Sequence, residues 1–530
     1  MTTQKITIYD TTLRDGAQGE GVNFSLMDKL RIARKLDEFG MDYIEGGWPG
    51  SNPKDIEFFE RMRNERLSHS KLCAFGSTRR PHRAAKDDDL IQQLLQAETP
   101  VITVFGKAWD FHVSHALKVS NEENLEMIHD TITFLKSRVD EVIFDVEHFF
   151  DGYKHNREYA MQCLKTAGEA GASVLALCDT NGGTMPMEMD AIMEDVVANI
   201  RTSIGIHTHN DSGCGVANAL IAVQKGASQV QGTINGYGER CGNANLTSII
   251  ANLRLKMGRD CLLPESLSHL TALSQYIDET ANLAPNTRAP FVGRSAFAHK
   301  AGVHVDAVLK HRSTYEHVEP ELVGNTRRML VSELSGGSTI VNKAAKHELD
   351  LTKSSPETRS LLKSVADLER HGYSFEGAEA SFELLLMKTM GTYRKLFDLD
   401  GFRIIVEQRA NETPITEATV KIKVNGEERF EVAEGDGPVH ALDSALRKAL
   451  LHFYPELAHI KLTDFKVRVV DTSDGTAAKV RTIIDSTDGS EVWSTVGVSE
   501  NMVVASWKAL VEGVVYGLLR KNIIKTHQPE

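Results

Sequence analysis

The chain has few cysteines, no C-x-x-C pair and no apolar run of the roughly 20 residues that cross a membrane. Its 6 cysteines are spread thinly over 530 residues. This usage gives no disulfide framework or zinc-finger motif, and it suits a reducing compartment. The N-terminus lacks the basic and then apolar segments of a signal peptide. We therefore expect a cytoplasmic protein.

Positive charge is also scarce, because 60 Lys and Arg residues face 73 Asp and Glu residues, for a net charge of −13. An acidic chain without a basic cluster argues against nucleic acid or an anionic membrane surface as a partner. An anionic small molecule stays compatible, since a local site can oppose the net charge. The overall composition is that of a globular protein of two to three domains.

The first half of the chain alternates short apolar runs with amphipathic stretches. Eight apolar or β-branched runs begin near residues 6, 42, 72, 101, 142, 174, 204 and 229. Between the first two, Ser25–Gly40 has apolar residues at helical spacing and a glycine at the expected end. The pattern predicts an α/β fold, a (β/α)8 TIM barrel over residues 1–280. A doubly wound open sheet is the alternative, but no G-x-G-x-x-G follows the first strand.

Two further segments follow the predicted barrel. Residues 281–396 have an irregular helical pattern, which predicts helical linker subdomains. Residues 397–530 begin with alternation around an Asn425–Gly426 turn, a strong hairpin signal, and continue with an amphipathic helix. The segments FEVAEGDGPVHALDSALRKAL and WSTVGVSENMVVASWKALVEG resemble each other. We therefore predict a C-terminal α+β domain with an internal pseudo-repeat, serving regulation or dimerisation.

The stretch IGIHTHND places two histidines one residue apart at the end of the seventh predicted strand. Side chains at i and i+2 of a strand share a face, so His207 and His209 point the same way. With Asp15 after the first strand and Asn243 after the eighth, they offer a ligand set for a divalent ion. The alternative is that strand-end histidines are structural and that the glycines near Asn243 only permit a turn.

Other polar residues gather at the same predicted strand ends. Arg14 is suited to hydrogen-bond an oxygen that gains negative charge, or it forms an ordinary salt bridge. Glu147 and Thr180 are suited to bind or orient a small substrate, although Thr180 is equally suited to cap a helix. Phe105 and Phe144 are expected to crowd the pocket and favour a small substrate, unless both rings belong to the barrel core.

Three segments carry a resemblance to a known family: YDTTLRDGAQGEG, HTHNDSGCGVANALIAV and NGYGERCGNANL. They resemble the metal-dependent acyl-CoA condensing enzymes of the isopropylmalate synthase and homocitrate synthase family. The segments GGWPGSNPKD, DVEHFFDGYKHN and AEGDGPVHALDSALRKAL are most similar to its citramalate-forming bacterial members. The resemblance covers nearly the whole chain, and the tail resembles the amino-acid-binding regulatory domain of these synthases. Ala17 departs from the glutamate usual in the family, whereas Gln18 is retained.

The resemblance implies a role for each matching residue. Those that match the ligands of a divalent metal (Mn²⁺, Mg²⁺ or Zn²⁺) are Asp15, His207, His209 and Asn243. Arg14 matches the arginine that polarises the keto oxygen, and Glu147 matches an acidic active-site residue. Thr180 matches a substrate-carboxylate contact, and Gln18 is expected to bind substrate with it. His304 and Tyr315 match residues that reach an active site, usually that of the partner subunit, which implies a homodimer.

The implied reaction is a Claisen-type condensation of acetyl-CoA with a 2-oxo acid, followed by thioester hydrolysis. The likeness favours pyruvate, giving (R)-citramalate and CoA in the first step of a pyruvate route to isoleucine. His304, helped by Tyr315 or Glu147, is the favoured base. The alternatives are a 2-isopropylmalate synthase that uses 2-oxoisovalerate, a carbon–carbon lyase like hydroxymethylglutaryl-CoA lyase, and a non-catalytic amino-acid sensor.

In the tail, the loops EGDGPV and GVSENM each lead into a predicted helix N-terminus, where backbone N–H groups can hold a carboxylate. The predicted regulatory residues are Gly435, Asp436, Gly437, Pro438, Ser499 and Asn501. Together with the resemblance, these loops predict feedback inhibition by a branched-chain amino acid, with isoleucine as the expected effector. A dimerisation domain without a ligand is the alternative.

Overall fold

The computed structural model describes residues 5–332, 335–345, 351–410, 413–470 and 478–525. The chain divides into two compact units. The first comprises Met1–Phe297 and Val318–Arg327, and the second comprises Ala298–His317 and Arg328–Glu530. Each unit is described by itself below.

The first unit is built on a closed parallel barrel in which each strand pairs with the next and β8 pairs with β1. This confirms the predicted (β/α)8 barrel, with all eight strands near their expected starts. The strands are β1 (Thr7–Asp10), β2 (Tyr43–Gly47), β3 (Lys71–Ser77), β4 (Val101–Lys107), β5 (Glu141–Glu147), β6 (Val174–Asp179), β7 (Ser203–Thr208) and β8 (Gln229–Gly232).

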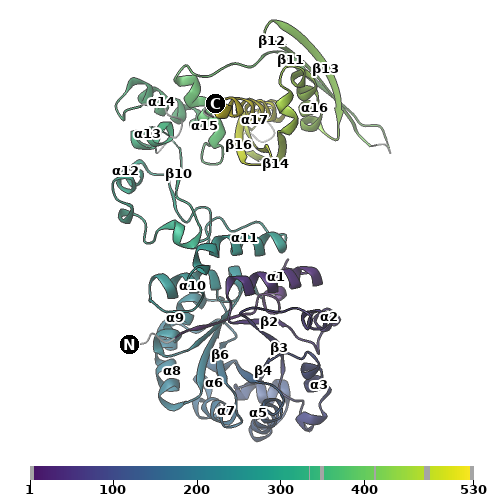
Figure 1. The fold of residues 1–530 in the computed structure, drawn as a ribbon, viewed down its shortest axis with the longest axis vertical. Helices are drawn as coiled ribbons and strands as arrows, with labels where there is room; N and C mark the ends of the chain where they lie inside the picture. Colours follow the sequence, from purple (N-terminus) through teal and green to yellow (C-terminus); the bar gives the residue numbers. More distant parts are fainter. Residues whose placement is uncertain (1–4, 333–334, 346–350, 411–412, 471–477, 526–530) are drawn as a thin grey trace. The chain divides into compact units, whose positions relative to one another are not determined.

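Helices form a ring around these strands (Figure 1). They are α1 (Leu26–Phe39), α2 (Pro53–Met62), α3 (Asp89–Gln96), α5 (Asn121–Lys136), α6 (Phe149–His155), α7 (Arg157–Glu169), α8 (Pro186–Asn199), α9 (Gly215–Lys225) and α10 (Leu246–Leu255), with α11 (Leu270–Thr280) after the barrel. Helix α1 shows why the prediction of helix ends works. Ser25 and Asp28 form a capping box at its start, and Gly40, with φ +88°, ends it in a left-handed conformation.

Short helical segments complete the first unit. They are η1 (Gly16–Gln18), η2 (Ala85–Asp87), α4 (Asp110–His112), η3 (Val113–Leu117), η4 (Ile234–Gly236), η5 (Ser266–His269) and η7 (Pro320–Val323). The main core lies between strands and helices, while Tyr9, Cys73, Val101 and Ile143 form a smaller cluster of their own. Polar residues follow at the carboxyl ends of the strands, the end at which barrels of this kind place their active sites.

The second unit begins with short elements. They are β9 (Ala298–His299), α12 (Gly302–Lys310), η6 (Arg312–Thr314), β10 (Arg328–Met329), α13 (Gly337–Ala345), α14 (Pro356–Arg370) and α15 (Glu379–Thr389). Strands β9 and β10 pair in parallel. Helices α13, α14 and α15 contribute to one buried apolar cluster that includes Ile340, Leu361 and Phe382.

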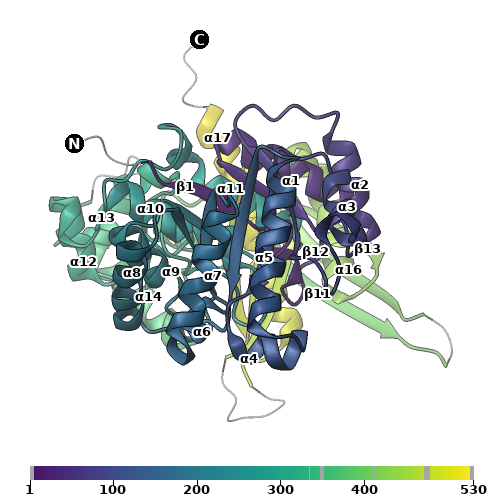
Figure 2. The same cartoon turned by 90° about the horizontal axis from the view of Figure 1, so that it is seen from below.

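Two copies of a three-stranded antiparallel sheet with a helix follow, which confirms the predicted pseudo-repeat. The first copy contains β11 (Asp398–Glu407), β12 (Ile415–Val424), β13 (Glu427–Gly435), α16 (Pro438–Leu451) and η8 (Pro455–His459). The second contains β14 (Lys461–Val469), β15 (Val480–Thr487), β16 (Val492–Ser499) and α17 (Met502–Lys525). The predicted hairpin is present: β12 and β13 pair antiparallel, and the turn between them has Asn425 at φ 50° and Gly426 at φ 89°. Figure 2 shows these two strands from a second direction.

One helix in the described part of the chain, Met502–Arg520 of α17, is long and apolar enough to cross a membrane, which the sequence analysis did not predict. Most of it is buried inside the second unit. Ala505, Ala509 and Leu510 are buried, and the indole N–H of Trp493 on β16 donates to the carbonyl of Gly513 at 3.0 Å. The length and apolar character of α17 are thus those of a core helix under a sheet.

Candidate active site

A cavity of about 220 Å³ lies among the carboxyl ends of the barrel strands. Typical pockets for larger ligands have about 300–1,000 Å³, so this cavity favours a small reacting group. Its lining combines charged, imidazole and aromatic side chains: Arg14, Asp15, Gln18, Trp48, Phe75, Phe105, Asp145, Glu147, Cys178, Thr180, His207, His209, Glu239 and Arg240.

Three of the four predicted metal ligands converge in this cavity. Nε2 of His207 lies 3.3 Å from Nε2 of His209 and 3.4 Å from Oδ2 of Asp15. One ligand atom from each of the three residues lies within 4.8 Å of the others, and all three residues are buried. The two histidines come from the end of β7, and Asp15 follows β1, which is separated from β7 only by β8. This spacing suits one small cation held between them.

Asn243 lies directly across from His209, with which it forms an isolated antiparallel bridge. Its amide N–H donates to the carbonyl of Tyr237 at 3.2 Å, whereas its Oδ1 is buried without a hydrogen-bond partner. Gly238 has φ +150°, and a Cβ there would meet Nδ2 of Asn243 at 2.2 Å. The glycine thus permits the close packing of this loop on Asn243. A buried acceptor without a partner needs an explanation, and a bound cation supplies one.

The charges in the cluster are arranged for binding a cation. Burial alone would raise the pKa of Asp15, but the Arg14 guanidinium and His207 hold it well below its usual value. Burial and the neighbouring His207 lower the pKa of His209 to about 4. Asp15 is therefore a carboxylate and His209 a neutral imidazole at pH 7, which are the forms that coordinate metals.

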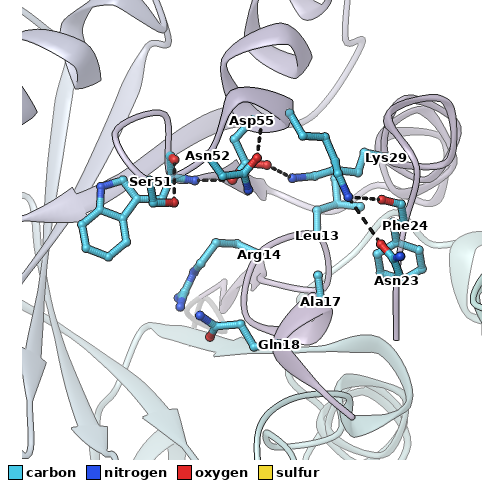
Figure 3. Close-up of a pocket in the computed structure, with 12 residues that line it drawn as sticks. Leu13, Arg14, Ala17, Gln18, Asn23, Phe24, Lys29, Ser51, Asn52 and Asp55 are labelled. Carbon is cyan, nitrogen blue, oxygen red and sulfur yellow. Dashed lines mark hydrogen bonds and ion pairs between the residues drawn. The ribbon is translucent and has the colours of Figure 1, made fainter. Parts of the chain in front are cut away.

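Arg14 is held by two contacts as well as by its neighbour Asp15. Its Nε donates to Oε2 of Glu45 at 2.5 Å, and its guanidinium carbon lies 3.7 Å from the centre of the Phe75 ring. Figure 3 shows the guanidinium of Arg14 and the amide of Gln18 pointing to the same side. The predicted salt bridge therefore exists, and it leaves other N–H groups of Arg14 at the cavity.

Glu147 and Thr180 both line the cavity, as predicted, and each has a protein partner. Glu147 forms an ion pair with Lys107 of the neighbouring strand β4. The hydroxyl of Thr180 accepts a hydrogen bond from the backbone N–H of His148 at 2.8 Å, so it holds the loop after β5 rather than capping a helix. His148 has φ 56°, a strained conformation for a residue other than glycine.

The two predicted pocket aromatics lie on opposite faces of their strands. Phe105 lines the cavity, but Phe144 is fully buried in the outer core between strands and helices and is absent from the cavity lining. Side chains alternate along a strand, so Phe144 points away from the face that carries Asp145 and Glu147. The expectation that Phe144 crowds the pocket is corrected accordingly.

The cavity instead has aromatic residues that sequence reasoning missed, Trp48 and Phe75. The Trp48 ring centre lies 5.9 Å from that of Phe75 and 5.6 Å from that of Phe105, in edge-to-face contacts. Phe75 and Phe105 stack at 5.5 Å. The signal was available for Phe75, which lies at the same strand-end level as the polar residues. Trp48 lies in a loop, where no periodicity indicates its direction.

His304 and Tyr315 belong to the second unit, not to the barrel. Their rings stack with centres 4.0 Å apart, and Tyr315 is 47% exposed. The two residues thus form a pair, and their action at an active site stays a prediction.

The predicted regulatory loops have different helix starts. Helix α16 follows Gly435, Asp436 and Gly437 and begins at Pro438. Its cap residue, Gly437, has no side chain that could accept a hydrogen bond from the first N–H groups of the helix. Before α17, Asn501 accepts hydrogen bonds from the N–H groups of Val503 and Val504 at 2.8 and 3.3 Å, and Ser499 accepts one from the N–H of Asn501. The start of α17 is therefore already capped, and that of α16 offers more N–H groups to a ligand.

Comparison with known proteins gives matches along nearly the whole chain. A model of the HMGL-like family matches residues 5–277, one described as homocitrate synthase post-HMGL domain-like matches 291–370, and the LeuA allosteric (dimerisation) domain matches 376–518. An (R)-citramalate synthase from Geobacter sulfurreducens is 54% identical over 98% of this chain and 99% of its own length. The chain belongs to the family of HMGL-like acyl-CoA condensing enzymes.

The sequence identity to other members of this family differs with the activity for which they are named. An (R)-citramalate synthase from Synechocystis sp. is 52% identical over 98% of this chain and 97% of its own. A probable 2-isopropylmalate synthase from Methanopyrus kandleri is 31% identical over 96% of this chain and 98% of its own. The recognition of the family from its three barrel motifs is confirmed, and the chain is an enzyme of this family.

Proposed function

We propose that this chain condenses acetyl-CoA with pyruvate and hydrolyses the thioester, giving (R)-citramalate and CoA. The observation that carries the proposal is the 46–54% identity, over nearly the full chain, to several (R)-citramalate synthases. Two relatives named as 2-isopropylmalate synthase or probable 2-isopropylmalate synthase are 30–31% identical. A small cavity with an aromatic wall supports a small 2-oxo acid as the second substrate.

Asp15, His207, His209 and Asn243 are the residues that we propose hold a divalent metal. The buried Oδ1 of Asn243, which has no protein partner, and the neutral His209 fit such an ion. When bound, the metal would act as a Lewis acid toward the oxygens of the 2-oxo acid. Mn²⁺ and Mg²⁺ suit the mixed nitrogen and oxygen ligands, as does Zn²⁺.

The remaining roles fall to side chains around the cavity. Arg14 donates hydrogen bonds to the keto oxygen of pyruvate, which gains negative charge as the new carbon–carbon bond forms. Gln18 and Thr180 bind the substrate carboxylate. A base takes a proton from the methyl group of acetyl-CoA, and we assign this step to His304 with Tyr315, or to Glu147.

The tail supports a homodimer with feedback inhibition by isoleucine. Apolar side chains are exposed on its sheets, among them Val406, Phe430 and Val469 at 56, 62 and 46%. An exposed apolar face of this kind is suited to a second copy of the chain. The uncapped start of α16 at Gly437 suits the carboxylate of an amino acid.

All six cysteines are free, as expected for a cytoplasmic enzyme.

The deciding experiment is an assay of CoA release by the full chain with acetyl-CoA and Mn²⁺ or Mg²⁺. Pyruvate, 2-oxobutyrate, 2-oxoisovalerate and 2-oxoglutarate are compared, with and without chelator and with isoleucine or leucine added. We expect release with pyruvate above the others, loss of activity with chelator, and inhibition by isoleucine rather than leucine. Preference for 2-oxoisovalerate would make the chain a 2-isopropylmalate synthase. No release with any acid would reject condensation and leave lyase and sensor functions for testing.

A further inference from the structure

Beneath the proposed metal site, hydrogen bonds link the ligand His207 to two further buried polar side chains, Gln231 and Asp145, which have no part in the proposed reaction. Nδ1 of His207 lies 2.9 Å from Oε1 of Gln231. The amide Nε2 of Gln231 donates to Oδ1 of Asp145 at 2.9 Å. His207, Gln231 and Asp145 have 5, 0 and 3% exposure, so water does not compete for these contacts. Buried polar groups in such a network fix one another's orientation.

Strand register explains how a residue of β8 reaches one of β5. His207 pairs with Gln231, so their side chains are neighbours on the inner face of the barrel. The next row of the barrel runs across four neighbouring strands, from β5 to β8. Its residues are Asp145, Ala176, Gly205 and Gln229, each paired with the next. Ala176 and Gly205 add almost no side-chain volume to this row. The space that they leave lets the Gln231 amide cross to Asp145.

The order of donors and acceptors then fixes the histidine tautomer. Burial raises the pKa of Asp145 to about 7. In its carboxylate form Asp145 only accepts hydrogen bonds, and the Gln231 group beside it is then the NH₂ group. The other end of the amide, its carbonyl oxygen, therefore faces His207 and only accepts. Nδ1 of His207 then donates a proton to Gln231, so Nε2 is the ring nitrogen that is available to a metal ion. That nitrogen is the one that lies beside Asp15 and His209.

We propose that Gln231 is a positioning residue for the metal site, holding His207 in the tautomer and ring orientation that presents Nε2 to the ion, and that Asp145 orients Gln231. The assignment rests on the metal site of the proposed function. Metal-binding histidines commonly donate their second N–H to an oxygen acceptor, and loss of that acceptor typically weakens metal affinity about 10–100-fold. A neutral amide does this without placing a further charge beside Asp15.

The test measures Mn²⁺ binding by the full chain, from the electron paramagnetic resonance signal of free Mn²⁺, so that it does not depend on turnover. Gln231→Leu removes the acceptor at similar volume, and we expect Mn²⁺ affinity to fall about 10–100-fold. Activity should return when Mn²⁺ is raised, with kcat at saturating metal within a few fold of the parent. Asn218→Leu is the control: it changes a buried amide of the same unit that donates to the carbonyl of Thr184 and not to the network of Gln231, and it should alter Mn²⁺ affinity less than threefold.

A double variant separates positioning from simple loss of packing. Gln231→Glu with Asp145→Asn exchanges the amide and the carboxylate between the two positions. The amide at position 145 then donates to the carboxylate at position 231, and that carboxylate still accepts from Nδ1 of His207. This pair should bind Mn²⁺ at least five times more tightly than Gln231→Leu. Unchanged affinity in Gln231→Leu, or equal loss in Asn218→Leu, would overturn the positioning role while the metal site stands. Failure of the unaltered chain to bind Mn²⁺ or Mg²⁺ would instead overturn the metal site and this assignment with it.

Discussion

Arg14 and Glu45 form a buried ion pair beside the cavity, with Nε of Arg14 donating to Oε2 of Glu45 at 2.5 Å. Glu45 is fully buried and also accepts from the hydroxyl of Tyr9 at 2.9 Å. Burial lowers the pKa of Arg14, but Glu45 and Asp15 outweigh it and raise the pKa overall. The arginine is thus kept charged and fixed in direction, as a group that stabilises a developing oxyanion must be.

Glu45→Gln should lower kcat by about 10–100-fold while the KM for acetyl-CoA changes little. A hydrogen bond to a charged group contributes about 1.5–3 kcal/mol, which corresponds to that range of rates. Steady-state kinetics with pyruvate measure the effect. Glu38→Gln, at an exposed glutamate of α1, is the matched control and should leave kcat unchanged. A parent-like kcat in Glu45→Gln would show that Arg14 needs no such partner.

Trp48 is expected to limit the size of the 2-oxo acid. Its indole closes the aromatic wall with Phe75 and Phe105 beside the cavity. Trp48→Ala should raise kcat/KM for 2-oxobutyrate relative to pyruvate by about tenfold or more, since one methylene is worth about 10–200-fold in a fitted pocket. Kinetics with both acids give this ratio.

The control for this prediction is Trp109→Ala. Trp109 is a tryptophan of the same unit that does not line the cavity, so its loss should leave the substrate ratio near that of the parent. If Trp48→Ala lowers turnover with both acids equally, the indole supports the barrel without selecting the substrate.

The fold of the barrel was predictable because its strands are short apolar runs that differ sharply from the amphipathic helices between them. The edge strands β11 and β14 were not predicted, because most of their residues are exposed and alternate weakly. In the site, Asp15 and His207 could be selected as candidates because they lie at predicted strand ends and match motifs of the family. Gln231 could not, because its role depends on the pairing of β7 with β8, which a linear sequence does not state.

Lys29 and Asp55 form a buried ion pair between α1 and α2. Both line the pocket of about 190 Å³ shown in Figure 3, which shares Arg14, Gln18 and Trp48 with the cavity of the candidate active site. Asp55 also accepts from the backbone N–H of Trp48 at 2.9 Å, so the pair supports the loop that carries the indole. Lys29→Met leaves the Asp55 carboxylate buried without its cation, which typically costs about 3–5 kcal/mol. We expect a clear fall in the thermal midpoint of the first unit by calorimetry.

Removing the charge from both partners separates ion-pair loss from packing. Lys29→Met with Asp55→Asn should recover part of the lost midpoint, since no uncompensated buried charge is left. Lys35→Met removes a partly exposed lysine paired with Glu38 on the same helix and should change stability by less than about 1 kcal/mol. Equal effects of Lys29→Met and Lys35→Met would contradict a structural role for the buried pair.

Asp10 gives the barrel a pH-dependent stability. Its carboxyl is fully buried and accepts hydrogen bonds from the backbone N–H and the hydroxyl of Thr12, both at 2.9 Å. Burial raises its pKa from 3.8 to about 7, even though these bonds lower it. The folded state therefore favours the protonated acid. Its stability should fall as the pH rises from about 4 to about 7 and should keep this loss at higher pH.

Asp10→Asn removes this titration while keeping a side chain of the same shape. The stability of the variant minus that of the parent should therefore be larger at pH 8 than at pH 5. Thermal unfolding of the two chains at both pH values, compared as a difference of midpoints, measures the effect. Asp87→Asn removes a carboxyl from the surface of the same unit and should show a much smaller change in that difference. A constant difference between Asp10→Asn and the parent at both pH values would mean that Asp10 binds the same number of protons in the folded and unfolded chain across this range.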